Sequence, residues 1–439
     1  VASRGLGDVY KRQTASGVAG LAVVRVSGHL ALTALKTISR KSHFDPNVLT
    51  RTSFYDSENG NLIDRGLAVY FAKPKSFTGE DVVEFHIHGG RATVDLLLKT
   101  LSGINQLRLA EPGEFSKRAF INNKMDLTAI EAMGDLINAQ TELQHNQALS
   151  QMDGSLNKLY LSWRKSLIEL VAYLEADIDF AEEDIPDDVL KNINEKIEIL
   201  LVEMNEHINQ RNQGEILRDG YRVAIVGTPN VGKSSLINLL ANRDVAIVSD
   251  REGTTRDALE VRLNIAGFPV VFTDTAGLRQ TSDEIEKKGI KITQKKIDEA
   301  NLVIELFDDP TKLNFHDERL TILNKCDLHN KENKTYDRAI NISVTTGDGI
   351  DHLIKQISDK VSNNFGSYSD TIPTKTRYIL GVQNSIQSLL NAKTIDLKNN
   401  SELMVEELRL AIQEIGKITG HVDVEEYLEV IFKDFCIGK

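Results

Sequence analysis

The sequence has little of several features that define whole classes of protein. Only two of its 439 residues are cysteine, Cys326 and Cys436, which excludes a disulfide scaffold and favours a reducing compartment such as the cytoplasm. No apolar run approaches the ~18 residues that span a bilayer, and runs such as 20–24 and 69–72 are only strand-sized. Hydrophobic residues at 41% and charged residues at 26% exclude disordered and fibrous classes. The length of 439 residues predicts two or three folded domains.

Basic residues are also fewer than acidic ones: the chain has 52 Lys and Arg and 64 Asp and Glu, which gives a net charge of -12. Such a balance argues against a protein that coats nucleic acid by charge alone. The excess is uneven, since residues 151–219 carry 7 basic against 16 acidic side chains, whereas residues 1–127 carry 17 against 12. The net charge therefore does not exclude a local RNA-binding or anion-binding surface in the N-terminal third. The acidic run at 177–188 is interpreted as a solvated loop and helix start.

The first 13 residues show neither the apolar segment of a signal peptide nor any strand or helix periodicity. We expect them to be a disordered lead or foreign to the fold, and we place an N-terminal α+β domain at residues 14–127. Strands and one helix are predicted there at residues 20–26, 67–71, 81–88 and 93–101.

Glycine and proline are rare between residues 126 and 213, and apolar residues from Leu156 to Leu174 recur at three- and four-residue steps, which predicts long helices. A second helical stretch is expected from residue 369, with an apolar run from Leu403 to Ile415 that includes Leu410. Between the two, strands at 222–226, 269–273, 302–307 and 320–323 alternate with helices, which indicates a mostly parallel sheet.

The simplest arrangement is a multidomain protein of α/β and α+β class. A helical domain would be built from residues 128–215 and 369–439, with an α/β domain at 216–368 inserted between them.

Residues 227–234, GTPNVGKS, match the phosphate-binding loop G-x-x-x-x-G-K-S between a predicted strand and a helix. Its glycines let backbone N–H groups turn toward phosphates, and the helix N-terminus adds partial positive charge. Lys233 would reach the β and γ oxygens, and the Ser234 hydroxyl would ligate Mg²⁺.

Three further elements follow in the order expected of a GTPase. The segment DTAG at 274–277 can hold the metal through water and meet a γ-phosphate, and Thr254 or Thr255 can supply a mobile metal-binding hydroxyl. In the segment NKCD at 324–327, Asp327 can accept hydrogen bonds from the ring N–H and the exocyclic amine of guanine, an amine that adenine lacks. The residues expected to bind GTP are Asn230, Val231, Gly232, Lys233, Ser234, Ser235, Ser249, Thr254, Thr255, Asp274, Thr275, Ala276, Gly277, Asn324, Lys325, Asp327 and Ser343.

Over residues 220–365 the chain thus resembles the TRAFAC-class GTPases. Ras-like members orient the attacking water with a glutamine after the DxxG motif, where this chain has Leu278, which cannot hydrogen-bond. Asn230 and the segment 253–257 resemble potassium-activated members, in which K⁺ takes the place of an arginine finger. The guanine loop departs from the usual S-A-K pattern, since it reads SVT at 343–345.

The chain ends in CIGK at 436–439, and together with the GTPase motifs this ending resembles the MnmE (TrmE) family of tRNA modification GTPases. Blocks at residues 19–28, 76–84, 88–90 and 111–127 resemble the N-terminal part of that family, and blocks at 176–183 and 406–419 its helical part. The resemblance extends from about residue 14 to residue 439, and residues 1–13 match no block.

The resemblance implies a GTP-hydrolysing, tRNA-binding homodimer that acts in the cytoplasm with an FAD-containing partner of the MnmG type. The pair adds an aminomethyl or carboxymethylaminomethyl group to carbon 5 of the wobble uridine, position 34. The one-carbon donor is a tetrahydrofolate derivative, 5,10-methylene- or 5-formyl-tetrahydrofolate, bound by the N-terminal domain.

The resemblance also assigns residues. It implies K⁺ ligands at Asn230, Ser249, Arg251 and Thr254, and Mg²⁺ ligands at Ser234 and Thr255. Glu286 would position the hydrolytic water indirectly, although it also fits an exposed helical glutamate. The implied folate contacts are Arg25, Glu84, Lys124 and Lys439.

Several alternatives stay open at this point. Cys436 is either a small buried hydrophobe or a reactive thiol near the folate. His86 and His88 have a metal-like spacing, but no further Cys or His lies nearby in the sequence, so a structural role is expected. A ribosome-assembly GTPase that switches on RNA is the alternative function, although no RNA-binding module with a G-x-x-G clamp is appended. A membrane-associated transport GTPase is disfavoured by the lack of spanning segments.

Overall fold

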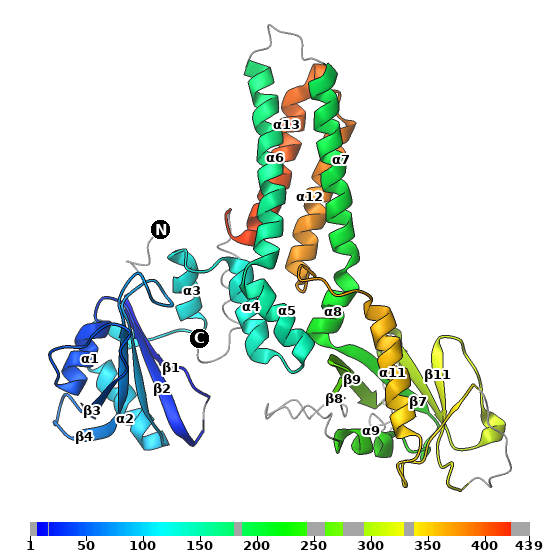
Figure 1. Cartoon of the computed structure of the whole chain (residues 1–439), viewed down its shortest axis with the longest axis horizontal. Helices are drawn as coiled ribbons and strands as arrows, with labels where there is room; N and C mark the ends of the chain where they lie inside the picture. The colour runs from blue at the N-terminus through cyan, green and yellow to red at the C-terminus, as the bar shows by residue number, and fades with distance from the viewer. Residues whose placement is uncertain are drawn as a thin grey trace, which may run out of the picture. The chain divides into compact units, whose positions relative to one another are not determined.

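The computed structural model describes residues 7–15, 17–179, 187–243, 260–274, 294–328 and 338–422 (Figure 1). These residues divide into two compact units, one made of residues up to 134 together with 415–422, and one made of the described part of 135–414. No helix within the described ranges combines the length and apolar character needed to cross a membrane.

The first unit is built on a six-stranded sheet in the order β3-β4-β5-β2-β1-β6, with antiparallel neighbours except for the parallel pair β1 and β6. Its strands and helices confirm the strands and the helix predicted from the sequence. They are β1 (Asp8–Arg12), β2 (Ala19–Ser27), α1 (Ala31–Ser39), β3 (Thr50–Tyr55), β4 (Leu62–Phe71), β5 (Val82–Gly89), α2 (Arg91–Ser102), β6 (Leu107–Leu109), α3 (Glu114–Ile121) and α4 (Leu127–Asn138), the last of which continues into the second unit.

The alternation of side chains along β2 and β5 gives the sheet two different faces. Val24 and Phe85 point to the face covered by α1 and α2, where they join the main apolar core of this unit. Arg25 and Glu84 stand opposite each other on the other face, because the register pairs these two residues. The sheet therefore buries one face and presents polar side chains on the other.

The expectation of a disordered or foreign lead is wrong for residues 8–12. They form β1, which lies inside the sheet between β2 and β6. Val9 packs against Phe115 and Phe77 on one face, and Tyr10 joins the α1 and α2 core on the other. β1 has only five residues, and a lysine, Lys11, lies on the same buried face as Val9. A strand this short, with a charged residue on its buried face, shows no clear alternation of apolar and polar residues, so the sequence pattern does not predict it.

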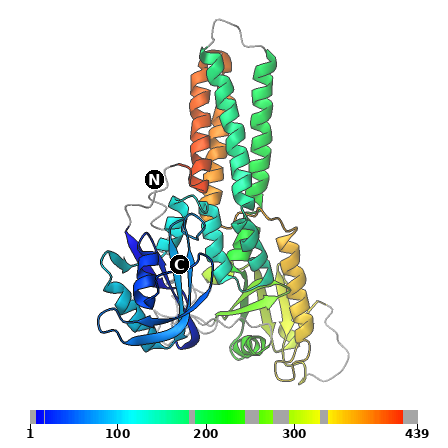
Figure 2. The ribbon, with the colours of Figure 1, turned by 60° about the vertical axis from the view of Figure 1, so that its left-hand side comes forward.

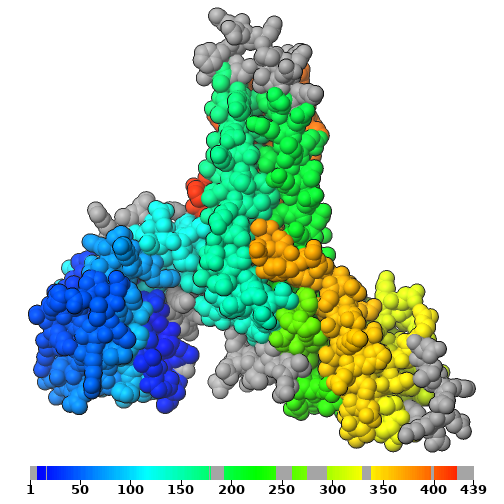
Figure 3. All heavy atoms as spheres, in the orientation of Figure 1, coloured from blue at the N-terminus to red at the C-terminus, as the bar shows by residue number. Residues whose placement is uncertain are grey.

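The second unit contains the predicted helices, of which α6, α7 and α12 run side by side in both ribbon views (Figures 1 and 2). Figure 3 shows the side chains of α6 and α7 meeting along one face of this bundle. The helices are α5 (Glu142–Met152), α6 (Ser155–Asp179), α7 (Asp187–Asn209), α8 (Arg211–Asp219), α12 (Thr376–Thr394) and α13 (Leu397–Thr419), the last residues of which, from Ile415, belong to the first unit. The apolar run on α13 is confirmed at Leu408 and Ile415, but Leu403 and Leu410 are exposed, because they fall on the opposite side of the helix.

Trp163, the only tryptophan in the chain, lies in the bundle core beside His207. The hydroxyl of Tyr160 lies 2.9 Å from Nε2 of His207, and the His207 ring is almost completely buried among aromatic rings. Burial disfavours the charged imidazolium and lowers the pKa of His207 to about 4, from an ordinary value of 6.5. The folded bundle therefore holds His207 neutral at neutral pH.

We expect the bundle to lose up to about 3 kcal/mol of stability as the pH falls from 6.5 to 4, because the unfolded chain binds a proton there and the folded one does not. The urea midpoint followed by Trp163 fluorescence should fall between pH 7 and pH 5. The variant His207→Gln should show a much flatter pH dependence. Equal midpoint shifts in the two proteins would contradict the assignment.

The inserted α/β domain carries a second six-stranded sheet in the order β12-β11-β10-β7-β9-β8. All of its pairs are parallel except β8 with β9, which confirms the mostly parallel sheet. Its elements are β7 (Tyr221–Gly227), α9 (Lys233–Ala241), β8 (Glu260–Ile265), β9 (Phe268–Asp274), β10 (Leu302–Phe307), the 3-10 turn η2 (Pro310–Lys312), β11 (Arg319–Leu323), β12 (Ile340–Asn341) and α11 (Ile350–Phe365).

The two ends of this insertion meet. The side-chain amide of Asn364, near the end of α11, donates to the hydroxyl of Tyr221, the first residue of β7, at 2.8 Å. Helix α8, which precedes the insertion, packs against the α/β domain, since its Ile216 and Leu217 belong to the apolar core of that domain.

Candidate functional site

The predicted phosphate-binding loop joins β7 to α9 at the carboxyl end of the parallel sheet. β7 lies between β9 and β10, so the chain changes direction across the sheet next to this loop, which is where open α/β sheets bind ligands. Gly227 has a φ of +154° and a Cβ there would lie 2.5 Å from the carbonyl oxygen of Leu306, so only glycine lets the loop leave the sheet. Asn230 also has a positive φ, +62°, at the exposed part of the loop.

Lys233 lies inside this loop with a side chain that is only 6% exposed. Its Nζ donates to the carbonyl oxygens of Gly227 and Thr228, both at 2.8 Å. The ammonium is therefore held at the centre of the loop, where the sequence places the β and γ phosphate oxygens. Ser234 and Ser235 follow at the exposed start of α9.

The segment after β11 is tied directly to the phosphate-binding loop. Nδ2 of buried Asn324 donates to the carbonyl oxygen of Val231 at 2.9 Å, and its Oδ1 accepts from the backbone N–H of Val344 at 3.2 Å. A Cβ on Gly232, which has a φ of +105°, would lie 2.4 Å from Nδ2 of Asn324. One asparagine thus joins the phosphate loop, the NKCD segment and the guanine loop.

Lys325 has a positive φ of +62°, and its Nζ pairs with Oδ2 of Asp308 at 2.8 Å. Asp308 directly follows β10, so it reaches Lys325 from the adjacent strand, and this partner was not foreseen from the sequence. The side-chain hydrogen bond from Lys325 holds the pKa of Asp308 below its ordinary value. Asp327 is exposed, as a side chain that accepts from guanine must be.

The guanine loop, which lacks the usual lysine, is held by its own hydrogen bonds. Ser343 is fully buried, and its hydroxyl accepts from the N–H of Thr346 at 3.1 Å while its own N–H donates to the carbonyl oxygen of Asp348 at 3.0 Å. Burial, with Asp348 and Asp327 nearby, raises the pKa of the Cys326 thiol, which disfavours the thiolate.

The structure therefore brings together the predicted residues Asn230, Val231, Gly232, Lys233, Ser234, Asn324, Lys325 and Ser343 at one edge of the sheet. Asp274 ends β9, which pairs with β7 at that same edge. Ser235 and Asp327 are exposed on the same two segments. The predicted residues that lie outside the described ranges are Ser249, Arg251, Thr254, Thr255, Thr275, Ala276, Gly277, Glu286, Cys436 and Lys439.

A second candidate site surrounds Arg25 on the polar face of the first sheet. Nε and Nη2 of Arg25 donate to Oε1 of Glu84 at 2.9 and 2.6 Å, and each side chain is 16% exposed. The guanidinium carbon lies 5.2 Å from the ring centroid of Phe77 and 5.7 Å from that of Phe115. The remaining nitrogen, Nη1, is buried without a hydrogen-bond partner. A buried donor of this kind needs an acceptor oxygen.

His86 lies beside Glu84 on the same strand, with its Nε2 3.3 Å from Oε2 of Glu84 but without a well-formed hydrogen bond. His86, followed by Arg25, holds the pKa of Glu84 below its ordinary value, although burial acts in the opposite direction. His88 pairs instead with Asp64 at 2.9 Å. Within the described ranges, no group of three or more His, Cys, Asp or Glu side chains could hold a metal ion.

Lys124 lies on the loop after α3, and its Nζ donates to the carbonyl oxygen of Pro74 at 3.0 Å. The loop that it touches, residues 72–81, carries Phe77. The structure thus groups Arg25 and Glu84 directly and places Lys124 on the loop that carries one ring of the site. Sequence patterns missed Phe77 and Phe115, whose only signal was their position inside the blocks at 76–84 and 111–127.

Comparisons with known proteins agree with this arrangement. A family model described as GTP-binding protein TrmE N-terminus matches residues 8–124, and one described as MnmE helical domain matches residues 127–436. The curated tRNA modification GTPase MnmE of Parvibaculum lavamentivorans is 45% identical over 439 residues, 98% of this chain and 99% of that protein. The MnmE of Rickettsia bellii is 42% identical over 447 residues, again 98% of this chain and 99% of that protein.

A solved structure of Aquifex aeolicus Era bound to GDP·AlF4⁻ is 23% identical and covers 38% of this chain and 66% of that one. Its TM-score of 0.25 is too low to support an argument. The first family model begins at residue 8, so the expectation that residues 8–13 match nothing in the family is wrong, in agreement with the position of β1.

Proposed function

Because this chain belongs to the MnmE family of tRNA modification GTPases, we propose that it is the GTP-hydrolysing component of the complex that modifies carbon 5 of the wobble uridine. The group added is an aminomethyl or carboxymethylaminomethyl group, and the one-carbon donor is a tetrahydrofolate derivative. Family membership itself makes the chain a GTPase that acts in tRNA modification, and the ribosome-assembly alternative is not favoured. The observation that carries the proposal is the phosphate loop, which Asn324 ties to both guanine-binding segments.

In this proposal the nucleotide is GTP with Mg²⁺. Lys233 neutralises charge on the β and γ phosphates, Ser234 and Thr255 supply hydroxyl ligands to the metal, and Asp327 selects guanine. The fixed position of the Lys233 ammonium supports this role, because a preorganised charge needs no rearrangement when negative charge develops. Glu286 is proposed to position the attacking water, because Leu278 cannot.

The proposed monovalent cation is K⁺, bound by Asn230 with Ser249, Arg251 and Thr254. The exposed position of Asn230 at a positive φ supports a ligand role, since its amide oxygen is a hard donor that suits such a cation. K⁺ bound by Asn230 would offset negative charge on the phosphates that the phosphate-binding loop alone leaves uncompensated.

We expect GTP turnover in KCl to exceed turnover in NaCl by at least about tenfold at equal ionic strength, because in this proposal K⁺, and not the smaller Na⁺, stabilises the charge of the transition state. Phosphate release measured in the two salts checks this. The variant Asn230→Ala should remove most of the difference. Equal rates in both salts for the unmodified protein would overturn the K⁺ assignment.

The proposed folate site is the polar face around Arg25. The buried, unpartnered Nη1 of Arg25 fits a ligand with acceptor oxygens, as the glutamyl carboxylates and pterin carbonyl of a folate supply. Glu84 holds Arg25 in place, and Lys124 and Lys439 add positive charge. When bound, the folate supplies the one-carbon unit, and Cys436 is proposed as a thiol near it.

The proposed assembly is a homodimer with an FAD-containing partner of the MnmG type, acting on tRNA in the cytoplasm. The excess of basic residues at 1–127 supports a tRNA or folate surface in the N-terminal third, and the net charge of -12 supports RNA binding that is shared with the partner.

The deciding experiment is complementation of a bacterial strain that lacks its MnmE relative. Mass spectrometry of wobble uridine in the tRNA should show the modification restored by this chain and not by its Lys233→Met variant. Unmodified uridine despite stable expression of the chain would refute the proposed function.

A further inference from the structure

The two rings that contact Arg25 come from segments that are distant in sequence. Phe77 belongs to the loop of residues 72–81 between β4 and β5, and Phe115 belongs to α3. Neither segment is part of the sheet that carries Arg25. The geometry of the site therefore depends on whatever fixes this loop against α3.

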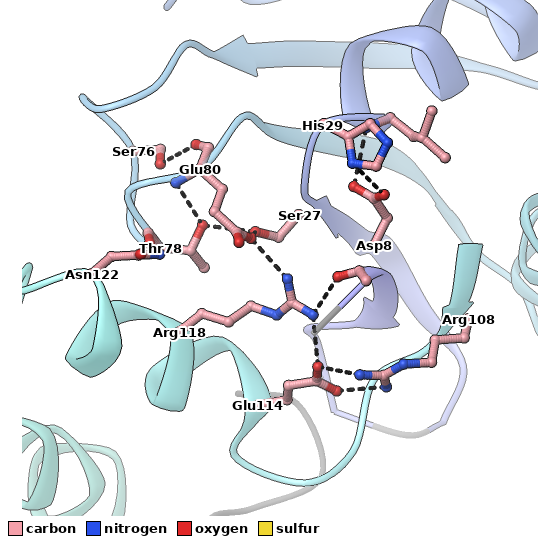
Figure 4. A network of polar contacts seen from close by, with 12 residues as sticks. Asp8, Ser27, His29, Ser76, Thr78, Glu80, Arg108, Glu114, Arg118 and Asn122 are labelled. Atoms are coloured by element: carbon pink, nitrogen blue, oxygen red, sulfur yellow. Dashed lines mark hydrogen bonds and ion pairs between the residues drawn. The ribbon is translucent and has the colours of Figure 1, made fainter. Parts of the chain in front are cut away.

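Arg118 makes that connection (Figure 4). It lies one helical turn after Phe115 on α3 and is fully buried. Its Nη1 donates to Oε2 of Glu80 on the loop at 2.9 Å, and its Nη2 donates to Oε1 of Glu114 on α3 at 2.8 Å. Oε2 of Glu80 also accepts from the hydroxyl of Ser27, the last residue of β2, at 2.8 Å. One guanidinium thus joins the helix and the loop, and Glu80 continues the connection to the sheet.

The loop is fixed a second time through Thr78, which is fully buried. Its Oγ1 lies 2.7 Å from Oγ of Ser27, and its carbonyl oxygen accepts from Nδ2 of Asn122, just after α3, at 2.7 Å. Gly79 has a φ of +75°, and a Cβ there would lie 3.1 Å from Cβ of Asn122 and 3.2 Å from Cγ of Lys124. The loop therefore lies closely against the residues that follow α3.

We propose that Arg118 and Thr78 are positioning residues of the Arg25 site. With Glu80, Ser27 and Asn122 they form an α3–loop network that sets Phe77 and Phe115 on the guanidinium of Arg25. The rings keep Arg25 on Glu84 and leave Nη1 available to an acceptor oxygen of the ligand. Because the loop is already ordered, the ligand does not have to order it on binding. The inference rests on the proposed folate function for the identity of that ligand.

The test uses the full chain and the variants Thr78→Val, Thr78→Ser and Arg108→Gln. Thr78→Val keeps the shape of the side chain and removes its hydroxyl, and Thr78→Ser keeps the hydroxyl. Arg108→Gln is the matched control, because Arg108 donates to the same Glu114 as Arg118 but from a position that is 44% exposed. Two quantities are measured: amide hydrogen exchange of residues 76–81, and the Kd for 5-formyltetrahydrofolate by calorimetry.

We expect Thr78→Val to speed exchange in residues 76–81 by about tenfold while exchange in β5 stays unchanged. Its Kd should rise by about tenfold, and Thr78→Ser should restore the Kd to within about twofold. Arg108→Gln should leave the Kd and the loop exchange near the unmodified values.

Unchanged loop exchange in Thr78→Val would overturn the network, and faster exchange with an unchanged Kd would overturn the positioning role. If the unmodified chain does not bind the probe at all, the folate proposal fails by itself. In that case faster loop exchange in Thr78→Val and its recovery in Thr78→Ser still support the network, and unchanged exchange refutes it.

Discussion

We expect Lys233→Met to lower kcat for GTP hydrolysis by a factor of about 10²–10³, the usual loss when one preorganised donor to developing charge is removed. Methionine keeps the length and the apolar stem of the side chain and loses only the ammonium. In the folded loop that ammonium is already fixed by the carbonyl oxygens of Gly227 and Thr228. Steady-state phosphate release at saturating GTP measures the effect.

Arg243→Met is the matched control in the same domain. Arg243 follows α9, the helix that begins with Lys233, and pairs with Asp351 at the surface. Its loss should change kcat less than about twofold, because exposed ion pairs contribute little. If Lys233→Met turned over GTP within threefold of the unmodified chain, the phosphate role of Lys233 would be wrong.

Arg118→Met should destabilise the first unit by about 3–5 kcal/mol, because it leaves carboxylates without the buried charge that they were paired with. Arg118 pairs with Glu80 and Glu114, and its Nη2 also donates to the carbonyl oxygen of Gly7 at 2.7 Å. Burial alone would raise the pKa of Glu114, but hydrogen bonds from Arg108 and Arg118 outweigh burial and keep that pKa below its ordinary value.

Hydrogen exchange of the most protected β5 amides in the full chain reports the stability of this unit separately from the second one. Arg108→Met removes the more exposed partner of the same Glu114 and should cost about 1 kcal/mol or less. A similar loss in both variants would show that burial of Arg118 does not set the energy of the network.

Much of the nucleotide site could be predicted because its residues are contiguous in sequence. The phosphate loop is eight adjacent residues between a strand and a helix, so the pattern alone places Lys233. The NKCD segment likewise follows a short buried strand, and the structure puts both at one sheet edge. The pattern does not predict the hydrogen bond from Asn324 to Val231 of the phosphate loop, because these two residues lie 93 positions apart in the sequence.

The Arg25 site was harder to predict, because its parts are brought together only by folding. The resemblance implies Arg25 as a folate contact, but nothing in the sequence indicates that Phe77 and Phe115 cover its guanidinium. Arg118 and Glu80 lie 38 residues apart and carry no motif of their own. Strand β1 was missed for a related reason, since its burial is set by the strands on both sides of it rather than by its own five residues.

The contact between Asn364 and Tyr221 has a consequence for how such a chain could have arisen. Because the two ends of the inserted domain lie next to each other, a single genetic event can add, remove or exchange this domain without changing the path of the surrounding helices. The helices on either side, α8 and α12, need only a short bridge in its absence, because Arg218 of α8 donates to the carbonyl oxygen of Thr374, just before α12, at 3.4 Å. The inserted α/β domain and the helical domain around it can therefore have separate ancestries within one chain.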